Sequence, residues 1–292
     1  ALLCVAALTA GFFVSGCGSD KAGGIGSVVS SVVDGGDEKA AAKLNTLIDA
    51  TNRFNSDNAS FAQFQAEGLA KLKGGFAEGA ITNQPHFDRL QADLEKAKKE
   101  GSTFKEVDAE RDNVLNILNE LVPVYKDLTA YDDSKAYMND GGAKGKELAA
   151  KYVAAVEKFD AAYAKFNETL NKVNAEQSKK QIEKLKKDGK KGYAAAMEST
   201  LRLTELVDKL EKAPQNADKA AVEKELSEIE ALLKSINNDR GQVLADRYNS
   251  VVGDVRQVLA DPSDNNLNNM IEGFNGYIDT YNSTTPDQFD AK

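Results

Sequence analysis

Histidine, cysteine and tryptophan are nearly absent from this sequence, and the shortage excludes several kinds of site. The 292 residues include one histidine, two cysteines and no tryptophan. A single histidine cannot supply a multi-histidine metal centre or a histidine-based catalytic triad. His86 follows Pro85 at an expected helix start, so we interpret it as a surface or capping residue. We therefore expect no metal, no cofactor and no enzymatic activity, although an enzyme that uses carboxylates alone would leave no such mark.

Positive charge is also in short supply. The sequence has 37 lysine and arginine residues against 46 aspartate and glutamate residues, a formal net charge of −9. Proteins bind nucleic acid largely by neutralising phosphates with lysine and arginine, so we expect no nucleic-acid partner. The same balance predicts that the acidic body does not lie on anionic lipid by electrostatic attraction.

The N-terminal apolar run is too short to cross a bilayer. Residues Ala1–Val14 carry no charge but fall short of the roughly 20 residues that a spanning helix needs. We interpret the run as the hydrophobic part of a secretory signal whose basic first residues precede this sequence.

The run ends in Val14-Ser15-Gly16-Cys17, which resembles the lipobox of bacterial lipoproteins. In that motif the small residues admit the signal peptidase and the cysteine thiol receives the lipid. We therefore predict signal cleavage at Gly16 and lipidation of Cys17. The alternative is an ordinary secretory signal followed by an incidental cysteine. Cys4 would leave with the signal, so the mature chain would contain no disulfide.

Lipidation would fix the location of the protein. Burial of acyl chains contributes about 0.8 kcal/mol per methylene, and two chains give stable attachment. We expect a lipid-anchored protein of the cell envelope that binds the lipid bilayer through acylated Cys17. No aspartate follows Cys17, which in enteric bacteria indicates the outer membrane. In a Gram-negative organism the predicted location is the periplasmic face of that membrane.

The rest of the sequence is predicted to be helical, because apolar residues recur at spacings of three and four and strand-like alternation is absent. Glycine and proline mark the expected breaks between helices. Helices are predicted at Glu38–Asn55, Phe61–Phe76, His86–Lys99, Thr103–Met138, Lys146–Lys187, Tyr193–Lys212, Lys219–Asn237, Gly241–Leu259 and Leu267–Tyr281. Pro123 is expected to interrupt the fourth of these.

This pattern predicts an all-α fold, either one elongated antiparallel helical bundle or two stacked bundles. The longest segment has a seam of alternating four- and three-residue steps, typical of coiled coils, at Tyr152, Val156, Phe159, Tyr163, Phe166, Leu170 and Val173. The expected organisation is a cleaved signal at 1–16, a Gly/Ser-rich tether at 17–36, a first bundle at 37–187 and a second at 188–292.

Two groups of polar residues are candidate binding sites. The pattern N-x-x-I-D-x-x-N occurs twice and places Asn45 with Asn52, and Asn275 with Asn282, on one helix face each. The pairs either form a polar site where the first and last helices meet or set the register of helix packing.

The second group is the Tyr/Asp corner, which we define as Tyr131, Asp132, Asp133 and Tyr137. It either lines a groove for a cationic or sugar-like ligand, or packs its tyrosines on the neighbouring helix while the aspartates face solvent.

Two apparent ligand motifs fail on inspection. Residues 141–147 lack the glycine spacing of a phosphate loop, and Glu147 replaces its Ser or Thr. Residues 261–272 place oxygen side chains near a calcium-loop frame, but Asn266 replaces the required glycine. The start of the final helix, capped by Ser263 or Asp264, explains the second motif better.

The segments Leu121–Val173 and Lys43–Asn55 together resemble the YiiG-like family of bacterial lipoproteins. The resemblance lies in an Asn-rich first helix, a Leu-x-Pro helix leading into the Tyr/Asp corner, and Gly145-Lys146-Glu147-Leu148 opening the long helix. It implies an all-helical envelope lipoprotein without assigned activity. We accordingly expect a scaffold or interaction module that contacts another envelope protein, with a solute- or metal-binding lipoprotein as the alternative.

Overall fold

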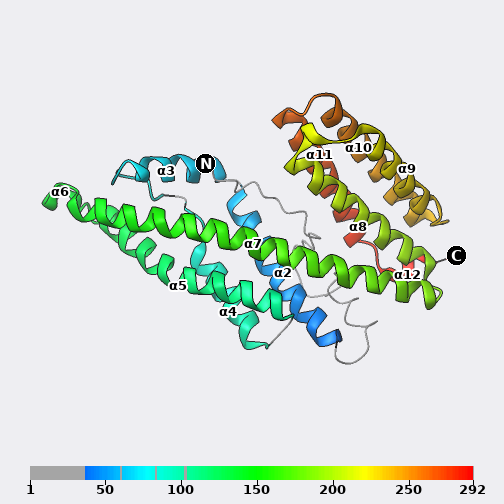
Figure 1. Ribbon diagram of the computed structural model, residues 1–292, viewed down its shortest axis with the longest axis horizontal. Helices are drawn as coiled ribbons and strands as arrows, with labels where there is room; N and C mark the ends of the chain where they lie inside the picture. The colour runs from blue at the N-terminus through cyan, green and yellow to red at the C-terminus, as the bar shows by residue number, and fades with distance from the viewer. Residues whose placement is uncertain (1–36, 60, 83, 102–103, 292) are drawn as a thin grey trace. The chain divides into compact units, whose positions relative to one another are not determined.

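A computed structural model describes residues 37–59, 61–82, 84–101 and 104–291. Within these ranges the regular structure is helical and contains no strand, so the all-α prediction is confirmed (Figure 1). The helices are α2 (Asp37–Ala59), α3 (Ala62–Lys73), α4 (Phe87–Lys99), α5 (Lys105–Asp133), α6 (Tyr137–Asp140), α7 (Ala143–Lys187), α8 (Lys191–Lys212), α9 (Lys219–Lys234), α10 (Asp239–Ala260), α11 (Asp264–Asn282) and α12 (Pro286–Phe289). A 3-10 turn, η1, spans Pro214–Asn216. The predicted signal, Gly16, Cys17 and the tether lie outside the described residues.

The helices end where glycine and proline predict. Gly101, Gly141 and Gly189 have positive φ angles of 105°, 64° and 80°, a region that favours glycine, and each follows a helix. The expected fourth helix is in fact two, because a turn at Ser134–Ala136 separates α5 from α6.

The expected interruption at Pro123 is wrong, because α5 continues through this residue. Proline removes one backbone donor and costs roughly 3 kcal/mol inside a helix. Burial of the apolar face on both sides, including Leu118, Leu121 and Leu128, offsets that cost.

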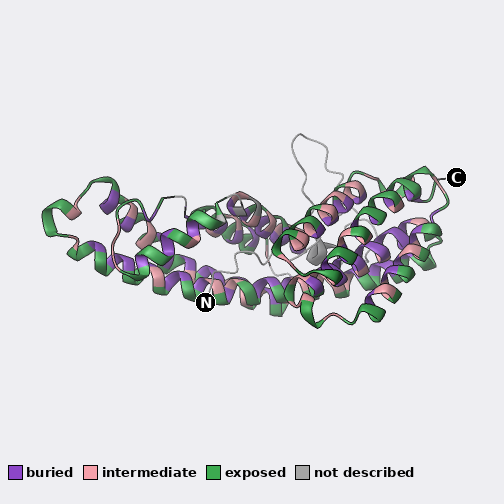
Figure 2. Cartoon of the chain, turned by 90° about the horizontal axis from the view of Figure 1, so that it is seen from above, coloured by how far each residue is buried: buried purple, intermediate pink, exposed green. Residues whose placement is uncertain are grey.

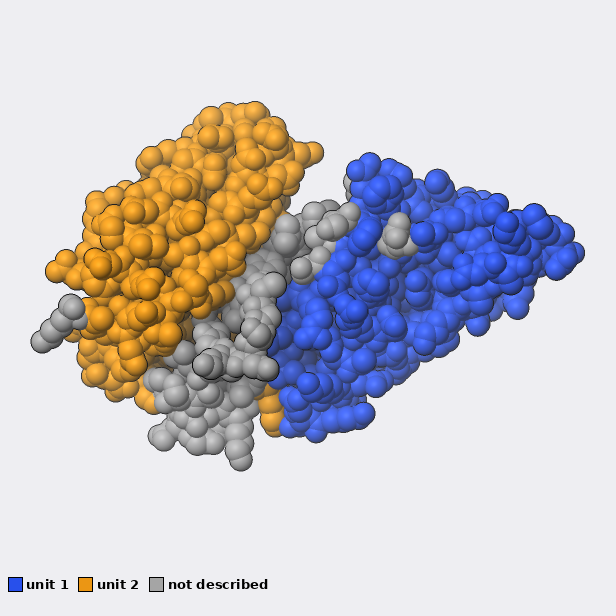
Figure 3. All heavy atoms as spheres, turned by 180° about the vertical axis from the view of Figure 1, so that it is seen from behind, with its two compact units in different colours: residues 1–8, 46–171 blue, residues 9–45, 172–292 orange. Residues whose placement is uncertain are grey.

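The described residues fall into two compact units (Figure 3). Unit 1 contains Thr46–Asn171, and unit 2 contains the remainder of α2 up to Asn45 together with Lys172–Lys292. The division of the chain therefore lies inside α7, whereas the turn where we expected two bundles to join, at 188–190, belongs to unit 2.

The core of unit 1 is rich in aromatic rings. Of the seam residues on α7, six are buried and Tyr163 is half-buried. Phe54 of α2 lies 5.8 Å from Phe159 and 5.3 Å from Tyr163, measured between ring centroids, and Phe87 of α4 lies 5.0 Å from Phe159. These edge-to-face contacts join three helices into one packed layer. Buried and exposed residues alternate along the helices, as expected where each buries one face (Figure 2).

The core of unit 2 surrounds α8, which has thirteen buried residues. Helices α9, α10 and α11 supply the other apolar faces, and ion pairs reinforce their outer edges. Arg202 of α8 forms two hydrogen bonds, of 2.7 and 2.9 Å, with the Glu225 carboxylate of α9. Arg256 of α10 contacts Glu223 in the same way, at 2.9 and 2.8 Å. Such bidentate pairs orient neighbouring helices.

The C-terminal helix α12 closes one end of this core. Its Phe289 is 2% exposed and stacks on Tyr193 and Tyr281, with ring centroids 6.1 and 5.9 Å apart. The Asp290 carboxylate accepts a hydrogen bond of 2.6 Å from the Gly192 amide at the start of α8. A side chain at Gly192 would collide with the Phe289 carbonyl, so glycine is required there.

Among the described helices we find none that is both long and apolar enough to cross a membrane.

Candidate functional site

The Tyr/Asp corner lies where α5, α6 and α7 follow one another in unit 1 (Figure 1). The Tyr131 hydroxyl donates a hydrogen bond of 2.5 Å to Asp140. Asp140 in turn accepts bonds from the amides of Gly142, at 2.9 Å, and Lys144, at 3.1 Å. These amides open α7, so Asp140 caps the long helix and Tyr131 holds the capping carboxylate in place. These favourable contacts lower the pKa of Asp140, with the Tyr131 hydroxyl making the largest contribution.

Three aromatic rings pack together behind this cap. Phe76 lies 5.1 Å from Tyr131 and 5.3 Å from Tyr137, between ring centroids. Gly145 in the first turn of α7 makes this packing possible. A β-carbon there would lie 2.5 Å from Tyr131 and 2.6 Å from Phe76. The two tyrosines of the corner thus pack on the long helix and on the loop that follows α3.

The aspartates of the corner differ from one another. Asp132 is 9% exposed and accepts a hydrogen bond of 2.9 Å from the Gly79 amide, so it holds the loop that carries Phe76. Asp133 is exposed. The Glu78 carboxylate beside the Tyr137 hydroxyl raises the pKa of Tyr137 to about 12, and burial adds to the effect, although the pair lacks regular hydrogen-bond geometry. The corner therefore has a clear structural role, and its role in ligand binding stays a prediction.

The asparagines of the repeated pattern are all half-buried. Asn52 belongs to unit 1, whereas Asn45, Asn275 and Asn282 belong to unit 2. Asn45, Asn52 and Asn282 each take part in an interaction. A site formed by the first and last helices stays a prediction.

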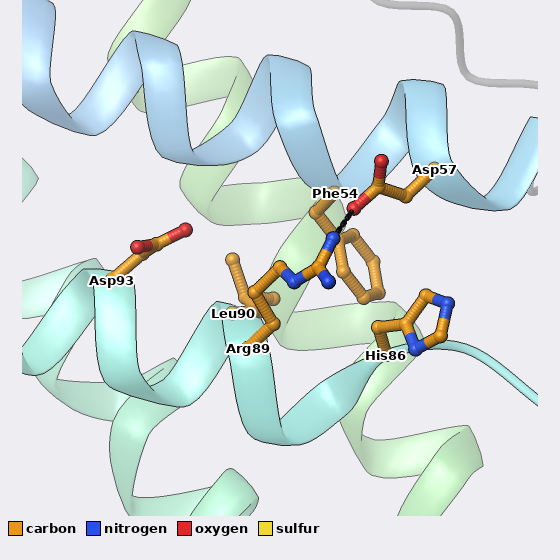
Figure 4. Close-up of a pocket in the computed structure, with 6 residues that line it drawn as sticks. All are labelled: Phe54, Asp57, His86, Arg89, Leu90 and Asp93. Carbon is orange, nitrogen blue, oxygen red and sulfur yellow. Dashed lines mark hydrogen bonds and ion pairs between the residues drawn. The ribbon is translucent and has the colours of Figure 1, made fainter.

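A shallow depression between α2 and α4 contains the histidine (Figure 4). It is lined by Phe54, Asp57, His86, Arg89, Leu90 and Asp93. Arg89 reaches across to form an ion pair with Asp57, and Arg53 contacts Asp93 at 3.1 Å. The depression is too shallow to hold even one water molecule. The two ion pairs therefore hold α2 and α4 together.

A buried polar network in unit 1 escaped the sequence analysis. The Tyr152 hydroxyl donates to Gln84 at 2.8 Å, and Gln84 donates to the Ala80 carbonyl at 3.2 Å. Nearby, Gln65 donates to Asn58 at 3.1 Å, and Asn58 donates to the Phe54 carbonyl at 2.6 Å. These amides are each at most 6% exposed. Their sequence surroundings do not distinguish them from surface amides, so nothing in the sequence could have indicated them.

Two carboxylates have strongly raised pKa values. Burial, with help from Glu157, raises the pKa of Asp160 in unit 1 to about 6. Burial, with help from Asp208, raises the pKa of Glu211 in unit 2 to about 7. The two belong to different units, and we find no cluster of metal-ligating side chains within the described ranges. Each carboxylate is therefore a pH-sensitive element of its own helix bundle.

Comparison with known proteins gives one match. A family model described as "Protein of unknown function (DUF3829)" matches residues 38–260. No curated protein and no solved structure matches the chain.

Proposed function

The chain belongs to the family of proteins of unknown function DUF3829, and on that premise we propose that it is a lipid-anchored protein of the bacterial cell envelope. The observation that carries the proposal is the sequence Val14-Ser15-Gly16-Cys17 after an uncharged apolar run. The resemblance to YiiG-like lipoproteins supports the same location.

The helical body acts, in this proposal, as a non-enzymatic scaffold or interaction module. The hydrogen bonds at the Tyr/Asp corner favour this role, because Tyr131 donates to the neighbouring Asp140, and Asp132 and Asp140 accept from backbone amides. The ion pairs at the depression likewise join helices rather than surround a ligand. The partner we propose is another protein of the envelope.

Lipid anchoring is tested by replacing the acceptor cysteine. We expect Cys17→Ser to abolish labelling by a palmitate analogue in the native host, because the thiol is the acylation nucleophile. The variant should also leave the membrane fraction or accumulate as an uncleaved precursor. Cys4→Ser is the matched control, since Cys4 lies in the segment that we expect to be removed. Unchanged labelling and unchanged membrane association of Cys17→Ser would show that this anchor does not exist.

The role of the body is tested by crosslinking in the native envelope. A reproducible crosslinked partner, together with no thermal shift from a panel of solutes and divalent cations, supports a scaffold. A shift with one solute or cation and no reproducible partner would favour a solute- or metal-binding lipoprotein instead.

A further inference from the structure

The second half of α7 and the turn that follows carry the opposite charge to the chain as a whole. Residues 172–191 contain eight lysines and three acidic residues, a charge of +5 by sequence. Ion pairs with Glu198, Glu205 and Asp287 reduce the local charge to about +2, whereas the chain carries −9. All eight lysines are exposed. At physiological ionic strength charges are screened beyond about 8 Å, so a partner that touches this segment meets its local charge and not the net charge.

The lysines occupy a particular face of the helix. The seam of α7 runs to Leu170 in unit 1 and ends at Val173, just inside unit 2, and both residues are buried. Continued in the same steps, the seam passes through Gln177, Lys180, Lys184 and Lys187. In unit 2 the buried face of α7 has moved to Ser178, Gln181, Ile182 and Leu185. The line that is apolar and buried as far as Val173 thus continues, after the half-buried Gln177, as an exposed line of lysines.

The lysines on this line differ from the neighbouring lysines in whether they form ion pairs. Lys179, Lys186 and Lys190 form ion pairs, of 3.0, 2.8 and 3.2 Å, with Glu205, Glu198 and Asp287. By contrast, Lys180, Lys184, Lys187 and Lys191 have no acidic partner among the described residues. We call Lys180, Lys184 and Lys187 the lysine stripe.

The helix dipole explains only part of this arrangement. Cations near the C-terminus of a helix are stabilising, but the effect is confined to the last turn. It therefore accounts for Lys184 and Lys187, which lie in the last turn of α7. Lys180 lies about two turns before the end, beyond that effect.

We propose that the lysine stripe contacts the anionic phospholipid headgroups of the membrane surface. This inference rests on the proposed lipid anchor, which would hold the stripe near that surface. The three ammonium groups are spread along about 10 Å of helix, from the rise of 1.5 Å per residue, so they can meet several headgroups at once.

The composition of the stripe favours lipid over the other anionic surfaces. Protein interfaces are enriched in aromatic residues and arginine and depleted in lysine, whereas residues 172–191 contain eight lysines and no arginine. Lysine is a flexible point charge that suits a fluid array of headgroups better than a fixed carboxylate. Single-stranded nucleic acid requires aromatic platforms for base stacking, and residues 172–191 contain no aromatic residue.

The test uses residues 18–292, which retain both units and every described helix but lack the predicted lipid. We expect this protein to float with vesicles of equimolar phosphatidylcholine and phosphatidylglycerol, and not with phosphatidylcholine alone. Added salt should abolish the binding. The triple variant Lys180→Gln, Lys184→Gln, Lys187→Gln should partition at least about tenfold less, since each lysine near an anionic surface contributes a factor of roughly five.

The matched control is the triple variant Lys126→Gln, Lys146→Gln, Lys158→Gln, which removes the same charge from three exposed lysines of unit 1. It should retain partitioning within about twofold, and circular dichroism should be unchanged for both variants. Equal losses in the two triple variants, or no preference of the parent protein for phosphatidylglycerol, would overturn the inference. Because this protein carries no lipid, such a failure would not affect the proposed lipid anchor, which the Cys17→Ser experiment tests separately.

Discussion

At the scale of single residues, Gly145 shows how closely the long helix approaches its neighbours. Any β-carbon at this position meets the rings of Tyr131 and Phe76. We therefore expect Gly145→Ala to lower the free energy of unfolding by about 1–3 kcal/mol, the usual cost of overpacking. Urea unfolding followed by circular dichroism measures the change.

The matched control for Gly145→Ala is Gly253→Ala. Gly253 lies inside α10 with no other heavy atom within 4 Å of its would-be β-carbon. Alanine is favoured over glycine in helices by about 0.5–1 kcal/mol, so this variant should be more stable than the parent. If Gly145→Ala also proved stabilising, the close packing at the corner would be wrong.

Glu211 provides a prediction about pH. Its pKa is about 7 in the folded protein, against an ordinary value of 4.5, chiefly because of burial. Between these values the folded protein keeps a proton that the unfolded chain has released, so stability falls as the pH rises from about 4.5 to about 7. Glu211→Gln should remove this loss and stabilise the protein at pH 7 by on the order of 1 kcal/mol, allowing for solvent screening.

Thermal melts of Glu211→Gln over this pH range test the prediction. Glu272→Gln, which removes the same charge at an exposed glutamate of the same unit, is the matched control. A profile for Glu211→Gln that runs parallel to that of the parent would mean that Glu211 does not titrate in this range.

The sequence alone could not decide whether the Tyr/Asp corner binds a ligand or packs on its neighbours, because the residues it contacts lie far away in the chain. The sequence predicts that tyrosines and aspartates gather where α5 ends, and they do. Whether they face a ligand depends on the loop at 74–80, more than 50 residues away, which supplies Phe76, Glu78 and the Gly79 amide. No periodic pattern brings that loop to α5, so the packing could not be predicted.

At the scale of secondary-structure elements, Asn238 joins the start of α10 to the segment that ends the fold. Its side-chain oxygen accepts bonds from the Arg240 and Gly241 amides, at 3.1 and 3.0 Å. Its side-chain nitrogen lies 3.2, 2.9 and 3.1 Å from the carbonyls of Gln288, Phe289 and Ala291. One amide thus caps a helix and fastens α12.

The two functions of Asn238 can be separated by substitution. Asn238→Asp keeps the helix cap but places a carboxylate against three carbonyls, so we expect it to destabilise unit 2 by about 1–3 kcal/mol in urea unfolding. At an ordinary N-cap the same exchange is nearly neutral. Asp218→Asn, at the N-cap of α9, is therefore the control and should change stability little. Equal effects of the two exchanges would rule out the fastening role.

The helices themselves were largely predictable. Glycines at 101, 141 and 189 and the apolar spacing locate the long helices to within a few residues. The short helix α12 was missed, although Thr285, Pro286 and Gln288 form a capping box with proline in the first turn. Its single turn has no periodicity to detect, so only its capping residues could have indicated it.

At the scale of the whole molecule, α7 contributes to two cores, and its apolar stripe changes face between them. A heptad seam predicts a single continuous interface, so the whole of α7 was expected to lie in one bundle. The end of the seam was visible in the sequence, since Lys180, Lys184 and Lys187 take the positions that Val173 would predict to be apolar. The net charge of −9 does not reveal the lysine stripe, because it is the sum of a basic segment and an acidic remainder.

The contact between α8 and α12 also constrains the order of folding. Gly192 and Tyr193 precede Asp290 by 97–98 residues, and the Asp290 carboxylate accepts hydrogen bonds from both their amides. Without the end of the chain, the rings of Tyr193 and Tyr281 lack the Phe289 ring that stacks on them. Unit 2 therefore cannot complete its core until the last residues of the chain have arrived, and a chain that ends before Phe289 would leave this aromatic surface uncovered.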